Sequence, residues 1–185
     1  MNFVVEEYRM YIPKEVERIL FTRQQLDECS ARLGTELTRD YSGKDPLFLC
    51  VLRGAVQFFS DLVRAVECPL DIDFIRASSY NGTESTGVVK VDMMNVGELA
   101  GRDVVIVEDI CDSGRSLVEM TKVISAMKPK SLKSVVLLDK PTRRVVEFKP
   151  DYTGFVIDDL YVIGNGFDCD GRFRNLPYIG VYKQS

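Results

Sequence analysis

The stretch that decides the fold is VVIVEDICDSGRS, residues 104 to 116. It opens with four β-branched apolar residues in a row, a pattern typical of a strand buried on both faces of a sheet. Two carboxylates, Glu108 and Asp109, follow directly. A helix is expected next, because apolar residues then recur at helical spacing up to Lys128. These residues are Leu117, Met120, Ile124 and Met127.

The rest of the chain repeats this alternation of strand and helix. Apolar or alternating runs predict strands at 47–52, 70–75, 135–138 and 154–157. Helical spacing predicts a helix capped by Thr22 and running to about Arg39, and another over 55–66. The alternation predicts an α/β fold with a mainly parallel twisted sheet flanked by helices and joined by right-handed crossovers.

Two segments fit this scheme less well. Residues 78–87, SSYNGTESTG, are small and polar, the composition of a mobile loop. The tail from Asp158 mixes short apolar pieces with glycines, and we expect a lid over the ligand edge of the sheet from residues 158–185 and the N-terminal segment. With 185 residues and no linker-like run, residues 1–185 are expected to form a single domain.

Composition excludes several classes of chemistry. The chain has no histidine, which removes the commonest general base and every Ser-His or Cys-His arrangement. The five cysteines are odd in number and form no CxxC pair, so neither a disulfide framework nor a zinc site is indicated. A net charge of -4 argues against broad nucleic-acid binding. The absence of a signal segment and of any run near the ~20 apolar residues of a membrane span favours a cytoplasmic location.

The residues after the strand at 104–107 form a candidate ligand site. In open α/β sheets, ligands lie beyond the carboxyl ends of the strands, where Glu108 and Asp109 are expected. An isolated Glu-Asp pair would be read as a solvated strand end. The following residues, 112–116, change that reading, because a glycine, two hydroxyls and successive backbone N–H groups at the start of a helix can cradle a phosphate.

This stretch resembles the phosphoribosyl-pyrophosphate (PRPP) binding motif of type I phosphoribosyltransferases, in the form of the hypoxanthine-guanine branch. Other segments match in the right order: VLRGA (51–55), SSYNGTESTG (78–87), LLDKPTRR (137–144), YVIGNGFD (161–168) and FRNLPYIGVYK (173–183). Departures are few, with Arg115 where lysine is common, Ser113 and Ser116 where threonine is common, and Tyr161 where phenylalanine is frequent. None of these removes a donor or a ring.

The resemblance implies a PRPP site on the first part of the motif. Glu108 and Asp109 would hold the ribose hydroxyls or a magnesium-bound water on them. Asp112 would act as general base or acid at purine N7, which agrees with the missing histidines. The remaining PRPP and phosphate contacts would be Asp112, Ser113, Gly114, Arg115 and Ser116 for the 5'-phosphate, Arg53 and Gly54 in a pyrophosphate loop whose peptide is often cis, and Arg174.

The resemblance also implies a purine site and a metal. Lys140 would donate to the exocyclic O6, selecting 6-oxopurines over 6-aminopurines. Tyr161 would stack on the purine, and the Val162 backbone would bond the base edge. Asp168 would lie at the purine and metal contacts, so that Glu108, Asp109 and Asp168 are the candidate residues for Mg²⁺. The loop at Ser79 and Tyr80 would close over the centre and exclude water.

The expected activity is therefore Mg²⁺-dependent transfer of phosphoribose from PRPP to hypoxanthine or guanine in purine salvage, with xanthine a further candidate, by a homodimer or homotetramer. One alternative is a nucleotide-sensing, RNA-binding regulator on the same fold, which the acidic balance disfavours. A receiver-type signalling domain is another, but its acid pair ends the first strand. Cys111 could be a nucleophile, although without a histidine it reads better as a packing residue.

Overall fold

A six-stranded sheet forms the centre of the protein. The computed structural model describes residues 10–79, 89–94 and 96–183, and places the strands in the order β4-β3-β2-β5-β6-β7. All neighbouring strands run parallel except β4, which pairs antiparallel to β3 at one edge. The strands are β2 (Leu47–Leu52), β3 (Asp71–Ser79), β4 (Val89–Asp92), β5 (Asp103–Cys111), β6 (Ser131–Asp139) and β7 (Tyr152–Val156).

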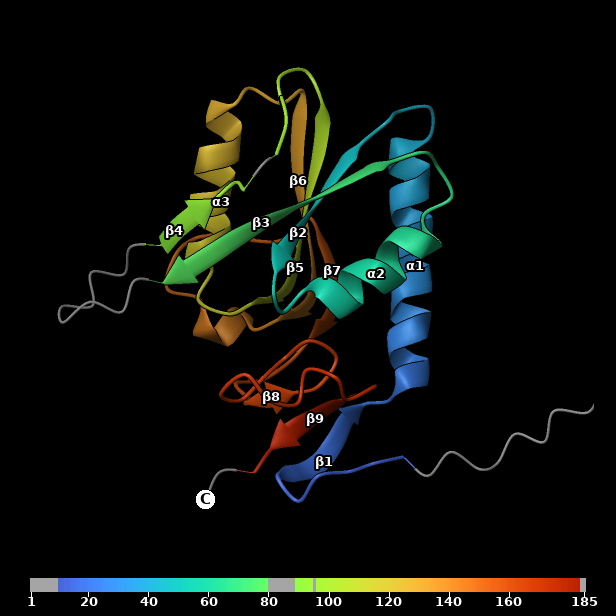
Figure 1. Cartoon of the computed structure of the whole chain (residues 1–185), viewed down its shortest axis with the longest axis vertical. Helices are drawn as coiled ribbons and strands as arrows, with labels where there is room; N and C mark the ends of the chain where they lie inside the picture. Colours follow the sequence, from blue (N-terminus) through green and yellow to red (C-terminus); the bar gives the residue numbers. More distant parts are fainter. Residues whose placement is uncertain (1–9, 80–88, 95, 184–185) are drawn as a thin grey trace, which may run out of the picture.

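Three helices cover the two faces of the sheet. Figure 1 shows α1 (Arg23–Tyr41) and α2 (Val56–Ala65) on one side, and α3 (Arg115–Ala126) on the other. Helix α1 begins where the sequence predicts, because the Thr22 hydroxyl accepts from the Gln25 backbone N–H while the Gln25 side chain accepts from the Thr22 N–H. The predicted α/β fold, with its mainly parallel sheet between helices, is confirmed.

Strand β5 is the central element of the core. Val104 and Ile106 pack into the cluster that contains α3, whereas Val105 and Val107 pack into the cluster that contains α1 and α2. This alternation explains the unbroken apolar run, because each face of the strand meets a different helix layer. Each such buried side chain contributes roughly 1.5–3 kcal/mol of hydrophobic free energy, so the strand that carries the acid pair is firmly held.

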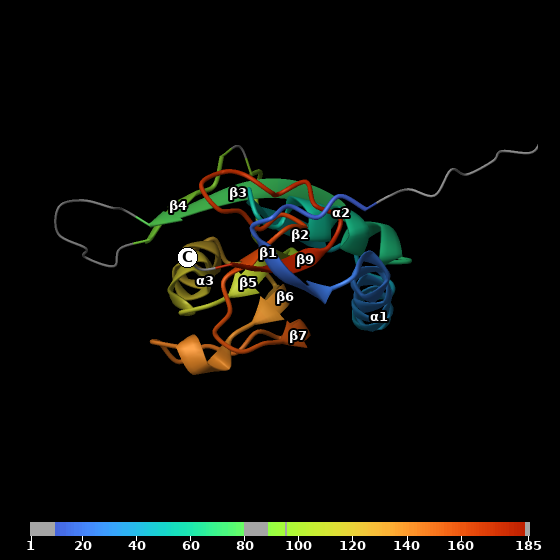
Figure 2. The ribbon, with the colours of Figure 1, turned by 90° about the horizontal axis from the view of Figure 1, so that it is seen from below.

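A second, smaller sheet lies below the end of the main one. It joins the two ends of the chain in the order β1-β9-β8, all antiparallel. Its strands are β1 (Val16–Phe21), β8 (Val162–Ile163) and β9 (Ile179–Tyr182). Seen from below in Figure 2, these strands lie across the ends of the main-sheet strands. Both chain ends therefore join in one small sheet. Its role as a lid over the ligand edge, and the single-domain division, stay predictions.

The five predicted strands are all present and differ from the prediction mainly in their bounds, whereas β1, β4, β8 and β9 were not predicted. Strand β5 continues to Cys111, so Glu108 and Asp109 lie within the strand, because backbone pairing with β6 continues past the apolar run. The expected loop at 78–87 begins later than predicted, since Ser78 and Ser79 belong to β3. Tyr80 and the rest of that loop lie outside the described residues. No helix in the described part of the chain has the length and apolar content needed to cross a membrane.

Candidate active site

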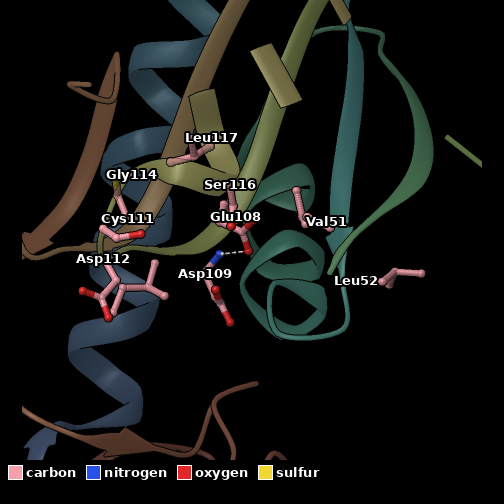
Figure 3. A pocket seen from close by; sticks show the side chains of 12 residues that line it. Val51, Leu52, Glu108, Asp109, Cys111, Asp112, Gly114, Ser116 and Leu117 are labelled. Atoms are coloured by element: carbon pink, nitrogen blue, oxygen red, sulfur yellow. Dashed lines mark hydrogen bonds between the residues drawn. The ribbon is translucent and has the colours of Figure 1, made fainter. Parts of the chain in front are cut away.

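A pocket opens where β5 ends and α3 begins. Figure 3 shows side chains from β2, β5 and the start of α3 around it, with both acids of β5 on its wall. The pocket brings together Glu108, Asp109, Asp112, Ser113, Gly114 and Ser116, with Val51, Leu52, Ala77, Ile110, Cys111 and Leu117 completing the lining. Most of the residues expected at PRPP thus share one pocket.

The two acids of β5 interact with each other. The backbone N–H of Asp109 donates to Glu108 Oε1 over 3.2 Å, the contact dashed in Figure 3. Glu108 is only 9% exposed. Burial, together with the charge of Asp109, raises the pKa of the Glu108 carboxyl well above its usual range, and burial also raises the pKa of Asp109. Ionised, this pair needs donors or a cation nearby, which a ribose diol or a metal ion would supply.

The loop before α3 has the geometry of an anion site. Gly114 is the N-cap of α3 at φ 84°, a backbone conformation that favours glycine. A Cβ at this position would also approach the Arg144 side chain to 2.8 Å. Arg115 and Ser116 are exposed in the first turn of a 12-residue helix, whose N–H groups and dipole favour a negative ligand.

The predicted pyrophosphate loop reaches the same pocket from β2. The peptide between Leu52 and Arg53 is cis, as the resemblance implies, and the Arg53 side chain is exposed. Gly54 lies against the acid pair, since a Cβ at this position would be 1.7 Å from Asp109 Oδ2. Only a residue without a side chain lets this backbone approach the carboxylate so closely.

Arg144 holds the segment from the end of β5 to the N-cap of α3, residues 111–114, which we call the phosphate loop because it carries predicted 5'-phosphate contacts. The sequence analysis did not single out Arg144. Its guanidinium donates to the backbone carbonyls of Cys111 and Asp112 and pairs with the Asp139 carboxylate. A further backbone bond runs from the Val145 N–H to the Ser113 carbonyl over 3.1 Å. The second arginine of LLDKPTRR was the available signal, but its partners lie in other strands.

The predicted purine residues are not among those that line this pocket. Lys140 follows β6 and is 6% exposed, with its backbone N–H on the Cys111 carbonyl at 3.0 Å. Tyr161 is 45% exposed, and its hydroxyl donates to the Asp168 carbonyl over 3.3 Å. Val162 is buried in β8. A buried cation and an exposed ring on neighbouring segments suit a flat base with a polar edge.

Asp168 and Arg174 form an ion pair in the lid. Arg174 Nη2 lies 2.5 Å from Asp168 Oδ1, and Nη1 donates to the Gly166 carbonyl over 2.6 Å. The positive charge of Arg174 opposes the burial that raises the pKa of Asp109. In this structure, however, the guanidinium itself is engaged by Asp168 and by the Gly166 carbonyl.

The three candidate metal residues do not form one cluster. Within residues 10–79, 89–94 and 96–183, no group of three or more His, Cys, Asp or Glu side chains could hold a metal ion. The donor set nevertheless fits Mg²⁺, which usually keeps several waters and binds one or two carboxylates together with substrate phosphates. Glu108 and Asp109 line the pocket, whereas Asp168 is not among its lining residues.

Cys111 is a packing residue. Its side chain is buried, and burial raises the pKa of the thiol to about 12. Because the thiolate is the nucleophilic form, this thiol is unreactive near neutral pH. The structure thus favours the packing role over the nucleophile considered from the sequence.

Comparison with known proteins agrees with this fold. The family description "Phosphoribosyl transferase domain" matches residues 18–172. The chain belongs to the phosphoribosyltransferase family. It is 44% identical to the hypoxanthine-guanine phosphoribosyltransferase of Lactococcus lactis, over 93% of this chain and 94% of that protein. It is 39% identical to that of Streptococcus thermophilus, over 94% and 97%.

Solved structures point the same way. A hypoxanthine phosphoribosyltransferase from Staphylococcus aureus superposes with a TM-score of 0.87 and 39% identity, covering 91% of this chain and 92% of that one. A hypoxanthine-guanine phosphoribosyltransferase from Bacillus anthracis gives a TM-score of 0.85 and 38% identity, over 91% and 99%. Within its family, the chain is a member of the hypoxanthine-guanine phosphoribosyltransferases, which confirms the resemblance carried by residues 104–116.

Proposed function

We propose that this protein transfers the 5-phosphoribosyl group of PRPP to a 6-oxopurine in purine salvage, releasing pyrophosphate and the nucleoside 5'-monophosphate. One observation supports this above the others: the acid pair of β5 and the N-terminus of α3 open into a single pocket. A diol and a phosphate on one sugar need both groups at once.

PRPP is held at three places. Glu108 and Asp109 accept from the ribose hydroxyls, and the donors of residues 112–116 hold the 5'-phosphate at the start of α3. Arg53, Gly54 and Arg174 meet the pyrophosphate. These contacts fix C1' in place, and such alignment accounts for a large part of the rate in group transfer.

Mg²⁺ is the expected cofactor, carried with the pyrophosphate of PRPP. Asp109 and Asp168, with Glu108 behind Asp109, are the carboxylates that would hold it. When bound, the ion neutralises the charge that develops on the departing pyrophosphate. The protein's own part is to orient these carboxylates, which the Arg174–Asp168 pair and the close approach of Gly54 support.

The purine is held on its O6 and N7 edge and on one face. Lys140 donates to O6, and Tyr161 stacks on the ring, while Val162 bonds the opposite edge. A ring nitrogen forms the new bond to C1' as the bond to pyrophosphate breaks. Asp112 then takes the proton that the ring loses at N7. A carboxylate fills this acid–base role because the chain has no histidine. Closure of the loop at Ser79 and Tyr80 would exclude water from this centre.

The test is turnover by the purified protein with PRPP and Mg²⁺. Hypoxanthine, guanine and xanthine are offered separately, and the monophosphate product is separated by chromatography. We expect turnover of hypoxanthine or guanine. No turnover of any 6-oxopurine would refute the proposal, and the xanthine arm decides whether the lid around residues 162–168 accepts a 2-oxo group.

We further propose that the protein is a homodimer or homotetramer in the cytoplasm. Family membership supports both statements. Light scattering coupled to size-exclusion chromatography measures the assembly directly, and a mass of one chain at micromolar concentration would exclude it.

A further inference from the structure

A chain of four charged side chains connects the phosphate loop to the purine lysine. Arg143 Nε donates to Asp112 Oδ1 over 3.2 Å, and Arg143 Nη1 lies 3.5 Å from Asp159 Oδ2. The other oxygen of that carboxylate, Asp159 Oδ1, lies 3.7 Å from Lys140 Nζ. The proposed acid–base group and the proposed O6 donor are thus joined through two residues to which no role has yet been given.

The backbone brings these side chains together. Pro141–Arg143 form a single 3₁₀ turn, η1, in which the Arg143 N–H donates to the Lys140 carbonyl over 3.0 Å. The turn is tied to the phosphate loop by the bond from the Lys140 N–H to the Cys111 carbonyl. Asp159 comes from a third segment, two residues before Tyr161. Three segments that carry proposed purine contacts therefore meet at Arg143, which contacts both Asp112 and Asp159.

The arrangement matches a requirement of the base. O6 and N7 lie on the same edge of a 6-oxopurine, so the groups that read them must keep a fixed spacing. Asp112 follows β5 and Lys140 follows β6, so no single strand or helix fixes the spacing of their side chains. Arg143 can bridge two carboxylates with its planar fork of donors. Asp112 Oδ2 is not used in this contact and can face the base.

The contact does little for stability. Arg143 is 53% exposed and its partners Asp112 and Asp159 are 40% and 56% exposed. Ion pairs as exposed as these add little to the free energy of unfolding, since both charges are well solvated when apart. A geometric role is the better account of an arginine placed between two acids at this site.

We propose that Arg143 and Asp159 are positioning residues that hold Asp112 and Lys140 at the spacing of purine N7 and O6. This inference rests on the proposed function. Arg143 acts through Asp112, and Asp159 acts through Lys140. Loss of Arg143 should therefore impair the chemical step, whereas loss of Asp159 should impair purine binding.

The test compares Arg143→Gln, Arg143→Lys and Asp159→Asn with the wild-type protein in steady-state assays with hypoxanthine, PRPP and Mg²⁺. We expect Arg143→Gln to lower kcat about tenfold or more while KM for PRPP stays within about twofold. Arg143→Lys should recover part of this loss, because an ammonium can contact one of the two carboxylates but not both. Asp159→Asn should mainly raise KM for hypoxanthine. Arg64→Gln, which removes an exposed arginine paired with Asp61 on α2, is the control and should match the wild-type protein.

A double-mutant cycle in kcat distinguishes a positioning role of Arg143 from a purely structural one. If Arg143 acts through Asp112, Arg143→Gln loses most of its effect in the Asp112→Asn background, whereas independent roles give additive effects. Additivity, an unchanged kcat in Arg143→Gln, or a fall in melting temperature that parallels the loss of activity would overturn the inference. Wild-type turnover with an unaffected Arg143→Gln refutes this inference alone, while no wild-type turnover refutes the proposed function and this inference with it.

Discussion

The backbone of Gly54 lies directly against the carboxylate of Asp109: a Cβ at position 54 would be 1.7 Å from Asp109 Oδ2. The glycine belongs to the loop after β2, and the aspartate belongs to the neighbouring β5. The predicted pyrophosphate loop and the predicted ribose and metal site are therefore in contact. A change at one of them must move the other.

Gly54→Ala is expected to displace Asp109. An aspartate side chain has too few bonds to swing clear while keeping its position, so we expect KM for PRPP to rise by at least about tenfold, equivalent to about 1.4 kcal/mol. Steady-state kinetics with varied PRPP measure it. Gly97→Ala is the control, because a Cβ there meets nothing within 4 Å. An unchanged KM for PRPP in Gly54→Ala would show that Asp109 does not contact PRPP or its metal.

Asp112→Asn is expected to lower kcat by roughly 10²-fold or more while PRPP still binds, because the amide keeps the shape of the side chain but cannot take a proton. Pre-steady-state turnover and PRPP binding by calorimetry separate the two effects. Asp45→Asn, at an exposed aspartate before β2, serves as the control. Unchanged turnover would remove Asp112 from the mechanism.

Lys140→Gln is expected to relax the choice of base. An ammonium only donates, whereas an amide can donate to a 6-oxo group or accept from a 6-amino group. We expect the ratio of kcat/KM for hypoxanthine to that for adenine to fall by roughly 10²-fold or more. Lys122→Gln, at an exposed lysine of α3, is the comparison variant. A ratio that stays at its wild-type value would mean that another group reads the 6-position.

The pH dependence of stability should report the acid pair. Burial and the charge of Asp109 raise the pKa of Glu108, whereas an unfolded glutamate titrates at about 4.3. At pH values between the unfolded pKa and the raised folded pKa of Glu108, the folded chain keeps a proton that the unfolded chain has released. The free energy of unfolding of the ligand-free protein therefore falls as pH rises through this window, and stays at its lower value above the folded pKa.

Glu108→Gln removes the part of that dependence that Glu108 contributes, and it keeps the acceptor for the Asp109 N–H. The variant should melt at a higher temperature than the wild-type protein at pH 8, by about 2–4 °C for each kcal/mol gained, and the difference should shrink toward pH 4. Glu98→Gln, at an exposed glutamate, is the control. A difference that does not change between pH 4 and pH 8 would argue against a raised pKa at Glu108.

The sequence predicted the main sheet well because its signals are local. Runs such as residues 47–52 and 104–107 are apolar throughout, and burial on both faces follows directly from that. The length of β5 was underestimated, because Glu108 and Asp109 end the apolar run while the backbone pairing with β6 continues to Cys111. The edge strand β4 was missed, as were the short strands β1, β8 and β9. Strands β1 and β9 are stabilised by each other although they lie about 160 residues apart in the chain.

The site was predicted as a set of residues but not as a set of contacts. Residues 108–116 are contiguous, so the sequence could place them together. Arg143 and Arg144 are neighbours in the same motif. Arg143 is exposed and bridges Asp112 to Asp159, whereas Arg144 is partly buried and pairs with Asp139. Nothing local distinguishes two adjacent arginines, since the difference arises from the strands that surround them.

Arg144 gives the last prediction, because it connects stability to the phosphate loop. Its side chain and that of Asp139 are 13% and 12% exposed, and the same guanidinium satisfies the carbonyls of Cys111 and Asp112. Arg144→Gln leaves a buried carboxylate without its cation, which typically costs about 3–5 kcal/mol. We expect a clear fall in melting temperature and weaker PRPP binding, since Gly114 packs against the Arg144 side chain. Arg102→Gln is the matched control: its partner Asp71 is 66% exposed, so thermal unfolding should change little. Equal melting temperatures for the two variants would show that Arg144 does not brace this loop.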